Sequence, residues 1–339
     1  MTIQAILIFV TAALSFLLTG LWRKQVVAWQ LYDHANHRSS HKGSVPRSGG
    51  VVFCVLGLTS LAIMWLLGDV SRSLAMALLF GGGMVCVVGF LDDLKSLPAI
   101  FRICIHVIAG ILAVICLSPL PTTFAGLSYE FPSWLMQCLV LVSIIWAINL
   151  WNFMDGIDGL AASQACVVLI VLSMWMCVSN IEEAHWIAVM AGLVGGFLCW
   201  NMSSSRFFMG DAGSGFLGFL IAVIILFLWR NEAITIWSGL ILTAMMWVDS
   251  TVTLMRRLWR RQRPWEAHRT HAYQHMACRG RSHKSVALMY VALQVGILLP
   301  LAALASLFPD FGIWLAIGVG VSLGTMALWT GAGSEPIST

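Results

Sequence analysis

Residues 134–178 read WLMQCLVLVSIIWAINLWNFMDGIDGLAASQACVVLIVLSMWMCV, and this stretch decides the class of fold. Two apolar runs, at 134–151 and 160–178, flank a short segment that carries Asp155 and Asp158. Each run is close to the length of about 20 apolar residues that a helix needs to cross a bilayer. The stretch therefore predicts two membrane helices joined by a polar turn.

The same pattern recurs along the whole chain of 339 residues, of which 59% are hydrophobic and only 10% are charged. Soluble domains carry roughly 25% charged residues, so an ordinary soluble fold is excluded. We expect an all-α, polytopic integral membrane protein with about eleven transmembrane helices, forming a single catalytic domain over residues 1–339. The remaining apolar segments lie at 3–22, 49–68, 73–91, 103–121, 185–200, 213–229, 234–255, 285–307 and 311–330.

Lysine and arginine alternate between the connections of these segments. The odd-numbered connections hold 17 of the 19 basic residues. Because basic residues favour the cytoplasmic side of a membrane, this bias predicts that the odd-numbered connections and the C-terminus face the cytoplasm. The expected cytoplasmic loops are 23–48, 92–102, 152–159, 201–212 and 256–284.

The third connection opens with two acids, Asp92 and Asp93, in the string FLDDLKSLP at 90–98. Adjacent acids point in different directions around a helix end, so one can face a metal while the other takes a proton or orients a neighbour. The alternative is two acids in a wet membrane interface, where charge is common.

The fifth connection spaces four polar residues three apart: Asn149, Asn152, Asp155 and Asp158. On a helix this spacing would keep all four on one face. A hard cation with oxygen ligands, Mg²⁺ in particular, suits such a set. The alternative is a capping turn that uses Asn and Asp.

The seventh connection, SSSRFFMGDAGSG at 203–215, places Asp211 between Gly210 and Gly213 at the start of an apolar helix. Small residues there expose backbone N–H groups, and the helix start favours anions, so the segment is typical of a phosphate or metal turn. A plain helix cap uses the same residues.

The ninth connection is the longest and carries nine cations together with His268, His271, His275 and His283. It predicts a trap for anions. Part of it, at 256–263, is also typical of a patch that binds anionic lipid headgroups, and the first three histidines permit a zinc site. The first connection adds a basic group that is either a second anion-binding wall or only the positive-inside signal: His34, His37, Arg38, His41, Lys42 and Arg47.

Carboxylates facing arginines and histidines favour phosphoryl transfer aided by a divalent cation, with one lipid phosphate and one soluble substrate. GxSxG and P-loop motifs are absent from the sequence. A cation- or proton-coupled transporter is the alternative, but transporters place ionisable groups near the bilayer midplane, where this chain offers only His106 and Asp249. Asp249 is expected to orient Arg256 or Arg257, or to bind substrate.

Five strings, taken in this order, resemble motifs of the polyprenyl-phosphate N-acetylhexosamine-1-phosphate transferase superfamily, which includes MraY and WecA. They are PRSGG at 46–50, DDLKSLP at 92–98, NLWNFMDGIDGL at 149–160, FFMGDAGS at 207–214 and AHRTHAYQ at 267–274. The resemblance implies transfer of a sugar 1-phosphate from a UDP-sugar to undecaprenyl phosphate with release of UMP. Mg²⁺ is the implied cofactor, with Mn²⁺ as an alternative, and no nucleic acid is an expected partner.

The resemblance also implies roles for individual residues, and three sets follow from it. The implied catalytic residues are Asp92, Asp93, Asp155, Asp158 and His268. The implied metal ligands are Asn152 and Asp211. The implied substrate-binding residues are Asn149, Arg206, Arg269, His271 and Arg47. Lys95 stands two residues after Asp93, where the MraY pattern has three, so Arg102 is a candidate substitute for that lysine.

The form AHRTHAYQ resembles the O-antigen-initiating branch typified by WbpL and WecA more than MraY. That branch implies UDP-GlcNAc, UDP-FucNAc or UDP-QuiNAc as donor and a role in lipopolysaccharide or related cell-envelope synthesis. The implied location is the bacterial inner membrane, with the active site facing the cytoplasm. The sequence leaves a homodimer open.

Overall fold

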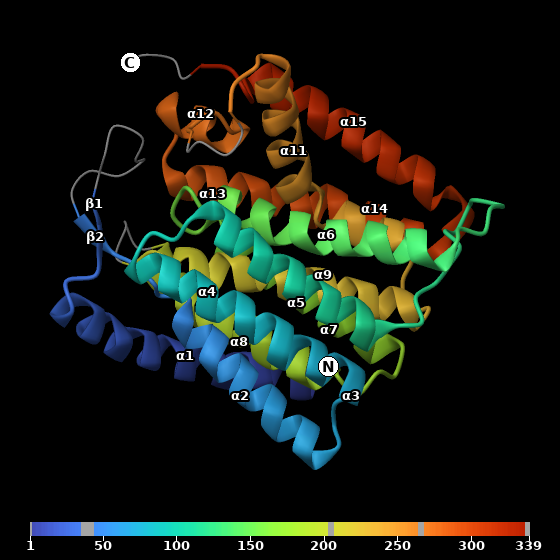
Figure 1. The fold of residues 1–339 in the computed structure, drawn as a ribbon, viewed down its shortest axis with the longest axis horizontal. Coiled ribbons are helices and arrows are strands. Elements are labelled where there is room, and N and C mark those ends of the chain that lie inside the picture. The colour runs from blue at the N-terminus through green and yellow to red at the C-terminus, as the bar shows by residue number, and fades with distance from the viewer. Residues whose placement is uncertain (1, 35–43, 203–206, 264–267, 336–339) are drawn as a thin grey trace.

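The computed structural model of the protein describes residues 2–34, 44–202, 207–263 and 268–335 (Figure 1). Helices dominate these residues, and a short antiparallel pair of strands lies between α1 and α2. The predicted all-α membrane fold is confirmed.

The helices differ in length, and several are continued by π-helical or 3₁₀ segments. In chain order the elements are α1 (Thr2–Ala28), β1 (Tyr32–His34), β2 (Ser44–Pro46), α2 (Val51–Leu67), α3 (Arg72–Met76), η1 (Ala77–Gly82), α4 (Gly83–Leu94), α5 (Ala99–Leu117), α6 (Ser133–Met154), α7 (Leu160–Val178), α8 (Ala184–Asn201), α9 (Gly210–Arg230), α10 (Ile236–Leu242), α11 (Ala244–Trp259), α12 (Ala272–Cys278), α13 (His283–Leu293), η2 (Gln294–Leu298), α14 (Leu299–Leu307), η3 (Pro309–Phe311) and α15 (Gly312–Thr330).

Every one of the eleven apolar segments in the sequence is helical, but not all form straight spans. Nine helical stretches of the described residues are long and apolar enough to cross a membrane. The ninth predicted span is instead the pair α10 and α11, which bends by 76° at Thr243. The second predicted span is α2, an apolar helix of 17 residues. The protein is thus a multi-pass membrane protein.

Helix α9 forms the centre of the bundle and packs against α4 and α6 (Figure 1). Its apolar window is 94% buried, whereas the window of α1 is only 11% buried. Because lipid can cover exposed apolar side chains, α1 fits a place at the lipid boundary, where it packs on α8. The site described below is therefore built on α9, whose apolar window is the most buried of the candidate spans among the described residues.

The odd-numbered connections meet at one end of the bundle, where Figure 1 shows the β1–β2 pair, α12 and the C-terminal end. The N–H of Gly49 donates to the carbonyl of Phe208 at 2.8 Å, and the N–H of Phe208 donates to the carbonyl of Pro46 at 2.9 Å. Even-numbered connections meet each other elsewhere, since the N–H of Ser71 in the second connection donates to Oε1 of Glu183 in the sixth at 3.0 Å. The polar segments therefore share one end of the molecule.

Candidate active site

Two acids from distant parts of the chain share one arginine at this polar end. Nη1 of Arg102 donates to Oδ2 of Asp92 at 2.6 Å and to Oδ2 of Asp211 at 3.1 Å. Asp92 lies in the last turn of α4 and Arg102 in the first turns of α5, so the predicted loop at 92–102 is shorter than expected. The side chains of Arg102 and Asp211 are each 33% exposed. The cluster is therefore open to a ligand.

Asn152 joins this cluster from α6. Its Nδ2 donates to Oδ1 of Asp211 at 2.9 Å and to the hydroxyl of Ser214 at 3.2 Å. A pocket of about 310 Å³ opens beside these groups. Its polar lining residues are Arg102, His106, Asn149, Asn152 and Asp211. We call it the polar pocket.

Asn149 lines the polar pocket one turn before Asn152 on α6, and its Nδ2 donates to the carbonyl of Ile145 at 2.7 Å. The spacing of three residues places side chains on one helical face only for Asn149 and Asn152. Helix α6 ends at Met154, and Asp155 already has non-helical backbone angles, φ −87° and ψ 35°. The expectation that all four polar residues share one helical face is therefore wrong for the two acids.

Asp158 turns toward α13, where its Oδ2 lies 3.0 Å from Nδ1 of His283. Asp155 is partly buried, and burial raises the pKa of its carboxyl well above the usual range. The negative charges of Asp211, Asp93 and Asp158 raise the pKa of Asp155 further. Asp155 therefore lies close enough to the other acids for their charges to raise its pKa, although it stands beyond the end of α6.

Asp93 is buried at 2% exposure, and both of its oxygens are occupied inside the protein. Oδ2 accepts from the hydroxyl of Ser48 at 2.9 Å, and Oδ1 accepts from the N–H of Asp211 at 3.1 Å. Arg47 donates to the carbonyl of Asp93. Asp93 thus holds the start of α9 against the end of α4 and fixes the place of Asp211, while Arg47 ties the segment after β2 to the same end of α4.

Replacing Gly210 by alanine is expected to lower stability and activity together. Gly210 has φ +77°, and a Cβ atom there would lie 2.3 Å from Oδ2 of Asp93. The left-handed backbone alone costs a residue with a side chain about 1–2 kcal/mol. Thermal unfolding in detergent measures the loss, with Gly318→Ala as the control because its Cβ would meet open space. Equal unfolding temperatures for the two variants would contradict this account.

Residues 268–271 of the ninth connection, which we call the histidine segment, approach the same pocket. The ring of His271 stacks on that of Phe153, which lines the polar pocket, with centroids 6.2 Å apart. It also stacks on His268 at 5.0 Å. Nδ1 of His268 lies 3.0 Å from the hydroxyl of Thr270. Arg269 contacts the sulfur of Cys278 at 3.7 Å, and Arg206 lies outside the described residues.

The environment of His268 keeps its ring neutral at physiological pH. Burial lowers the pKa of His268 to about 3, and the positive charges of His271 and Arg257 act in the same direction. Since the ring gains its proton only below this pKa, we expect the pH profile of activity between about pH 5 and pH 8 to be unaffected by His268 titration. Steady-state rates of His268→Gln should be lower but follow the wild-type profile. Loss of an acidic limb in the variant would contradict this.

Mg²⁺ fits the oxygen donors of the cluster. Among the described residues, no three His, Cys, Asp or Glu side chains gather closely enough to form a complete metal site. However, Asp92 and Asp211 already converge on one cation, Arg102, with the amide of Asn152 beside them. Mg²⁺ is usually held by one or two carboxylates plus phosphate and water, and the oxygens of Asp92, Asp211 and Asn152 are donors of that kind. Zinc has no comparable support, since His275 lies beside Gly331.

Two polar residues that hold the connections together were assigned no role from the sequence, although Ser48 lies within the motif PRSGG. Asn201, at the end of α8, is buried and accepts from the N–H of Gly159 at 2.9 Å, while its Nδ2 donates to the carbonyl of Phe207 at 3.1 Å. Ser48 holds Asp93, as described above. A lone Asn or Ser at a helix end is usually a cap, and only the tertiary partners reveal more.

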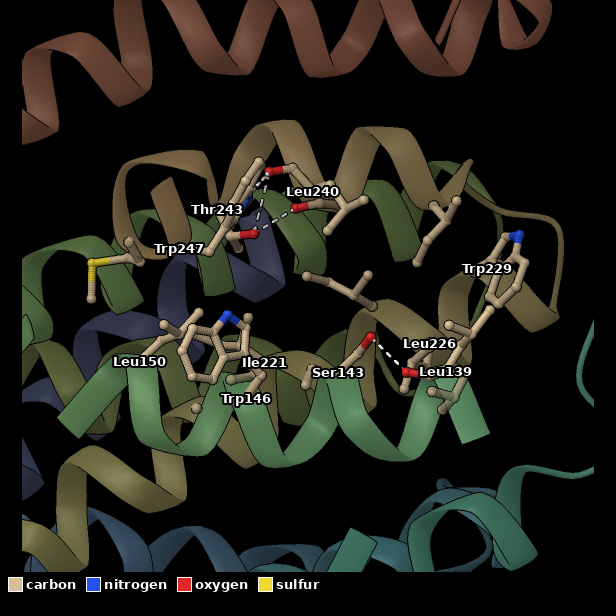
Figure 2. Close-up of a pocket in the computed structure, with 18 of the residues that line it drawn as sticks. Leu139, Ser143, Trp146, Leu150, Ile221, Leu226, Trp229, Leu240, Thr243 and Trp247 are labelled. Carbon is tan, nitrogen blue, oxygen red and sulfur yellow. Dashed lines mark hydrogen bonds between the residues drawn. The ribbon is translucent and has the colours of Figure 1, made fainter. Parts of the chain in front are cut away.

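A second cavity, of about 430 Å³, lies between α6, α9, α10 and α11 (Figure 2). Its walls come from α6, α9, α10 and α11 and are almost wholly apolar, as the labelled Leu139, Leu150 and Leu226 in Figure 2 illustrate. Trp146 lines both this apolar cavity and the polar pocket. The polar pocket and the apolar cavity therefore share a wall at Trp146.

The fold and the site together define a class: a multi-pass helical membrane protein with an acidic, phosphate-suited pocket next to an apolar cavity. Residues 75–228 match glycosyl transferase family 4. This match and the relatives below support a place for the chain in the superfamily of polyprenyl-phosphate N-acetylhexosamine-1-phosphate transferases.

Similar proteins from three bacteria support this membership. The chain is 26% identical to a probable undecaprenyl-phosphate N-acetylglucosaminyl 1-phosphate transferase of Bacillus subtilis (strain 168), over 93% of this chain and 88% of the relative. It is 27% identical to the undecaprenyl-phosphate alpha-N-acetylglucosaminyl 1-phosphate transferase of Escherichia coli (strain K12), over 86% and 82%. It is 29% identical to a phospho-N-acetylmuramoyl-pentapeptide-transferase of Thermotoga neapolitana, over 61% and 68%. The matches therefore include both N-acetylglucosaminyl 1-phosphate transferases and a phospho-N-acetylmuramoyl-pentapeptide-transferase.

Proposed function

We propose that this protein transfers an N-acetylhexosamine 1-phosphate from a UDP-sugar to undecaprenyl phosphate and releases UMP. The relatives that match this chain are sugar-phosphate transferases, which supports the coarse part of the proposal. The observation that carries the finer proposal is the junction of the polar pocket and the apolar cavity at Trp146. A polyprenyl phosphate has this same form, with a charged head on an apolar chain.

The reaction needs no external oxidant or reductant. An oxygen of the acceptor phosphate attacks the phosphorus that carries the sugar, and the bond from this phosphorus to the bridging oxygen of UMP breaks. UMP leaves with that oxygen, and the product is a lipid diphosphate sugar. Because the acceptor phosphate is already anionic, we favour direct attack over a covalent aspartyl intermediate.

Both reactants are anions, so the protein must offset their repulsion. Arg102 supplies one positive charge beside Asp92 and Asp211. A bound Mg²⁺, held by Asp92, Asp211 and Asn152, would neutralise diphosphate charge when present. Mn²⁺ would satisfy the same ligands. The oxygen-rich donor set is what supports this cofactor.

The histidine segment is proposed to contact the donor. His268 is neutral, so its ring can give or accept one hydrogen bond without adding charge. His271 stacks on it and Arg269 follows it in the chain, while Asn149 lines the polar pocket from α6 and Asp155 directly follows the end of α6. We propose that these side chains bind the nucleotide sugar, with Asp158 and Arg47 shaping the surrounding segments.

The orientation proposed from the charge bias places this end of the bundle in the cytoplasm of a bacterial inner membrane. UDP-sugars are cytoplasmic, which agrees with that orientation. UDP-GlcNAc, UDP-FucNAc and UDP-QuiNAc are the proposed donors, and the product would initiate O-antigen or related cell-envelope glycans. A homodimer is compatible with this scheme but is not required by it.

The transporter alternative loses support from the placement of the acidic groups. Asp249, an acid within a predicted span, is buried and bound to four donors of the protein itself, as described below. A transport site needs groups that exchange partners. A saturated carboxylate is better suited to hold structure.

The test is to incubate purified protein with labelled UDP-GlcNAc, UDP-FucNAc and UDP-QuiNAc and with undecaprenyl phosphate, with and without Mg²⁺ or a chelator. We expect UMP and lipid-linked sugar in equal amounts, and loss of both after chelation. Cation or sugar exchange across vesicles without UMP release would instead support a transporter.

A further inference from the structure

Asp249 lies within α11 and is buried at 4% exposure. Its Oδ1 accepts from the N–H of Ala272 at 2.9 Å and from the hydroxyl of Thr253 at 3.2 Å. Its Oδ2 accepts from the N–H of Tyr273 at 3.2 Å and from the hydroxyl of Tyr290 at 3.0 Å. The expectation that Asp249 orients Arg256 or Arg257 is therefore not met by these contacts.

The two main-chain contacts hold the residues that directly follow the histidine segment. Nδ1 of His271 lies 3.6 Å from Oδ1 of Asp249, and the His271 ring stacks on that of Tyr273 with centroids 5.7 Å apart. The carboxylate thus fixes the main chain of Ala272 and Tyr273, and the ring of His271 rests on that of Tyr273.

The same anchor reaches the acidic side of the site through Tyr273. The Tyr273 hydroxyl donates to the carbonyl of Phe153 at 2.8 Å, directly after Asn152. The fit is close, because a Cβ atom on Gly156 would lie 2.1 Å from this hydroxyl. A shift of Tyr273 would therefore disturb the end of α6.

The C-terminal segment, at residues 332 and 333, also holds the histidine segment. The N–H of Gly333 donates to the carbonyl of Thr270 at 2.7 Å. Arg256 donates to the carbonyl of Ala332 at 2.7 Å, and Arg260 donates to that of Gly333 at 3.2 Å. Asp249 and the C-terminal segment thus hold residues 268–273 between them.

We infer that Asp249 is a positioning residue of the transfer reaction, which holds His268 and His271 against the end of α6. It touches neither the polar pocket nor the acids at Arg102. Its effect is transmitted through the main chain at Ala272 and Tyr273. This inference rests on the proposed function for its kinetic test but not for its structural test.

The kinetic test uses Asp249→Asn, which keeps the size of the side chain but presents an N–H₂ group to one pair of donors. We expect kcat/KM for the UDP-sugar to fall by about tenfold or more, with KM for undecaprenyl phosphate within about twofold. In a background carrying His268→Ala and His271→Ala, the same change should cost less than about twofold. Equal losses in both backgrounds would overturn the inference.

The structural test is hydrogen exchange of the full-length protein in detergent. The amides of Ala272 and Tyr273 should exchange at least about tenfold faster in Asp249→Asn. Thr253→Val is the matched control, since it removes a contact to the same carboxylate from within α11 and should leave both amides protected. Tyr290→Phe provides a milder variant if Asp249→Asn does not fold, with faster exchange at Tyr273.

These readouts separate the two proposals. If the wild-type protein transfers no sugar phosphate, the proposed function fails, and the exchange rates still decide the role of Asp249. If the wild type is active but the amides of Asp249→Asn stay protected, the inference is overturned. The inference would also be overturned if kcat of Asp249→Asn fell only in proportion to a loss of folded protein, with both KM values unchanged.

Discussion

Asp211→Asn is expected to abolish sugar-phosphate transfer, and Asp92→Asn is expected to do the same. Each change keeps the size of the side chain but removes one of the two negative charges that converge on Arg102. Losing one electrostatic group of this kind costs about a hundredfold to a thousandfold in rate. UMP release from UDP-sugar, measured with purified protein, gives the rate directly.

The control for both variants is Asp69→Asn, an exposed acid in the turn after α2, which should leave the rate unchanged. All three variants are expected to insert and to elute as folded protein, because no packing is altered. If Asp211→Asn kept near-normal turnover with Mg²⁺ present, the assignment of this cluster as the reaction centre would be wrong.

The cluster shows how far local sequence pattern can lead. Asp92, Asn152 and Asp211 are separated by many residues, and each stands next to an apolar helix. The alternation of basic residues predicted that their segments share one side of the membrane. The structure brings Asp92 and Asp211 to one arginine, Arg102, and Asn152 binds Asp211. Arg102 is the residue that the sequence offered as a substitute for the lysine of the MraY pattern.

Where the pattern failed, the cause is tertiary. The spacing of Asn149, Asn152, Asp155 and Asp158 fits a helical face, but α6 ends at Met154, and Asp158 is drawn to His283 on α13. A partner that lies 125 residues away cannot be read from local spacing. Periodicity predicts a helix more reliably than it predicts where that helix ends.

The adjacent acids Asp92 and Asp93 also show what local sequence leaves undetermined. Asp92 and Asp93 are adjacent in sequence, yet one faces Arg102 and the other is enclosed by Ser48 and the N–H of Asp211. The sequence suggested a division of roles between them but not which acid takes which role. That choice depends on the direction in which α4 meets α9, and only the packed structure supplies it.

Filling the apolar cavity is the second change with a large expected effect. Ala222→Phe on α9 and Ser143→Trp on α6 would each place a ring in the slot of Figure 2, where Ser143 is labelled. The apolar chain of undecaprenyl phosphate would lose that space, so its KM should rise by about tenfold or more. KM for the UDP-sugar should change by less than about twofold, because the polar pocket is untouched.

The control is Ala13→Phe, which adds the same ring to an exposed position of α1, outside this cavity. Acceptor length gives a sharper comparison. A short-chain prenyl phosphate that ends before the cavity should be used equally well by the wild type and by Ala222→Phe, whereas undecaprenyl phosphate should distinguish them. If both acceptors suffered equally, the added ring would be acting through the protein fold, and the lipid chain would have to lie elsewhere on the bundle.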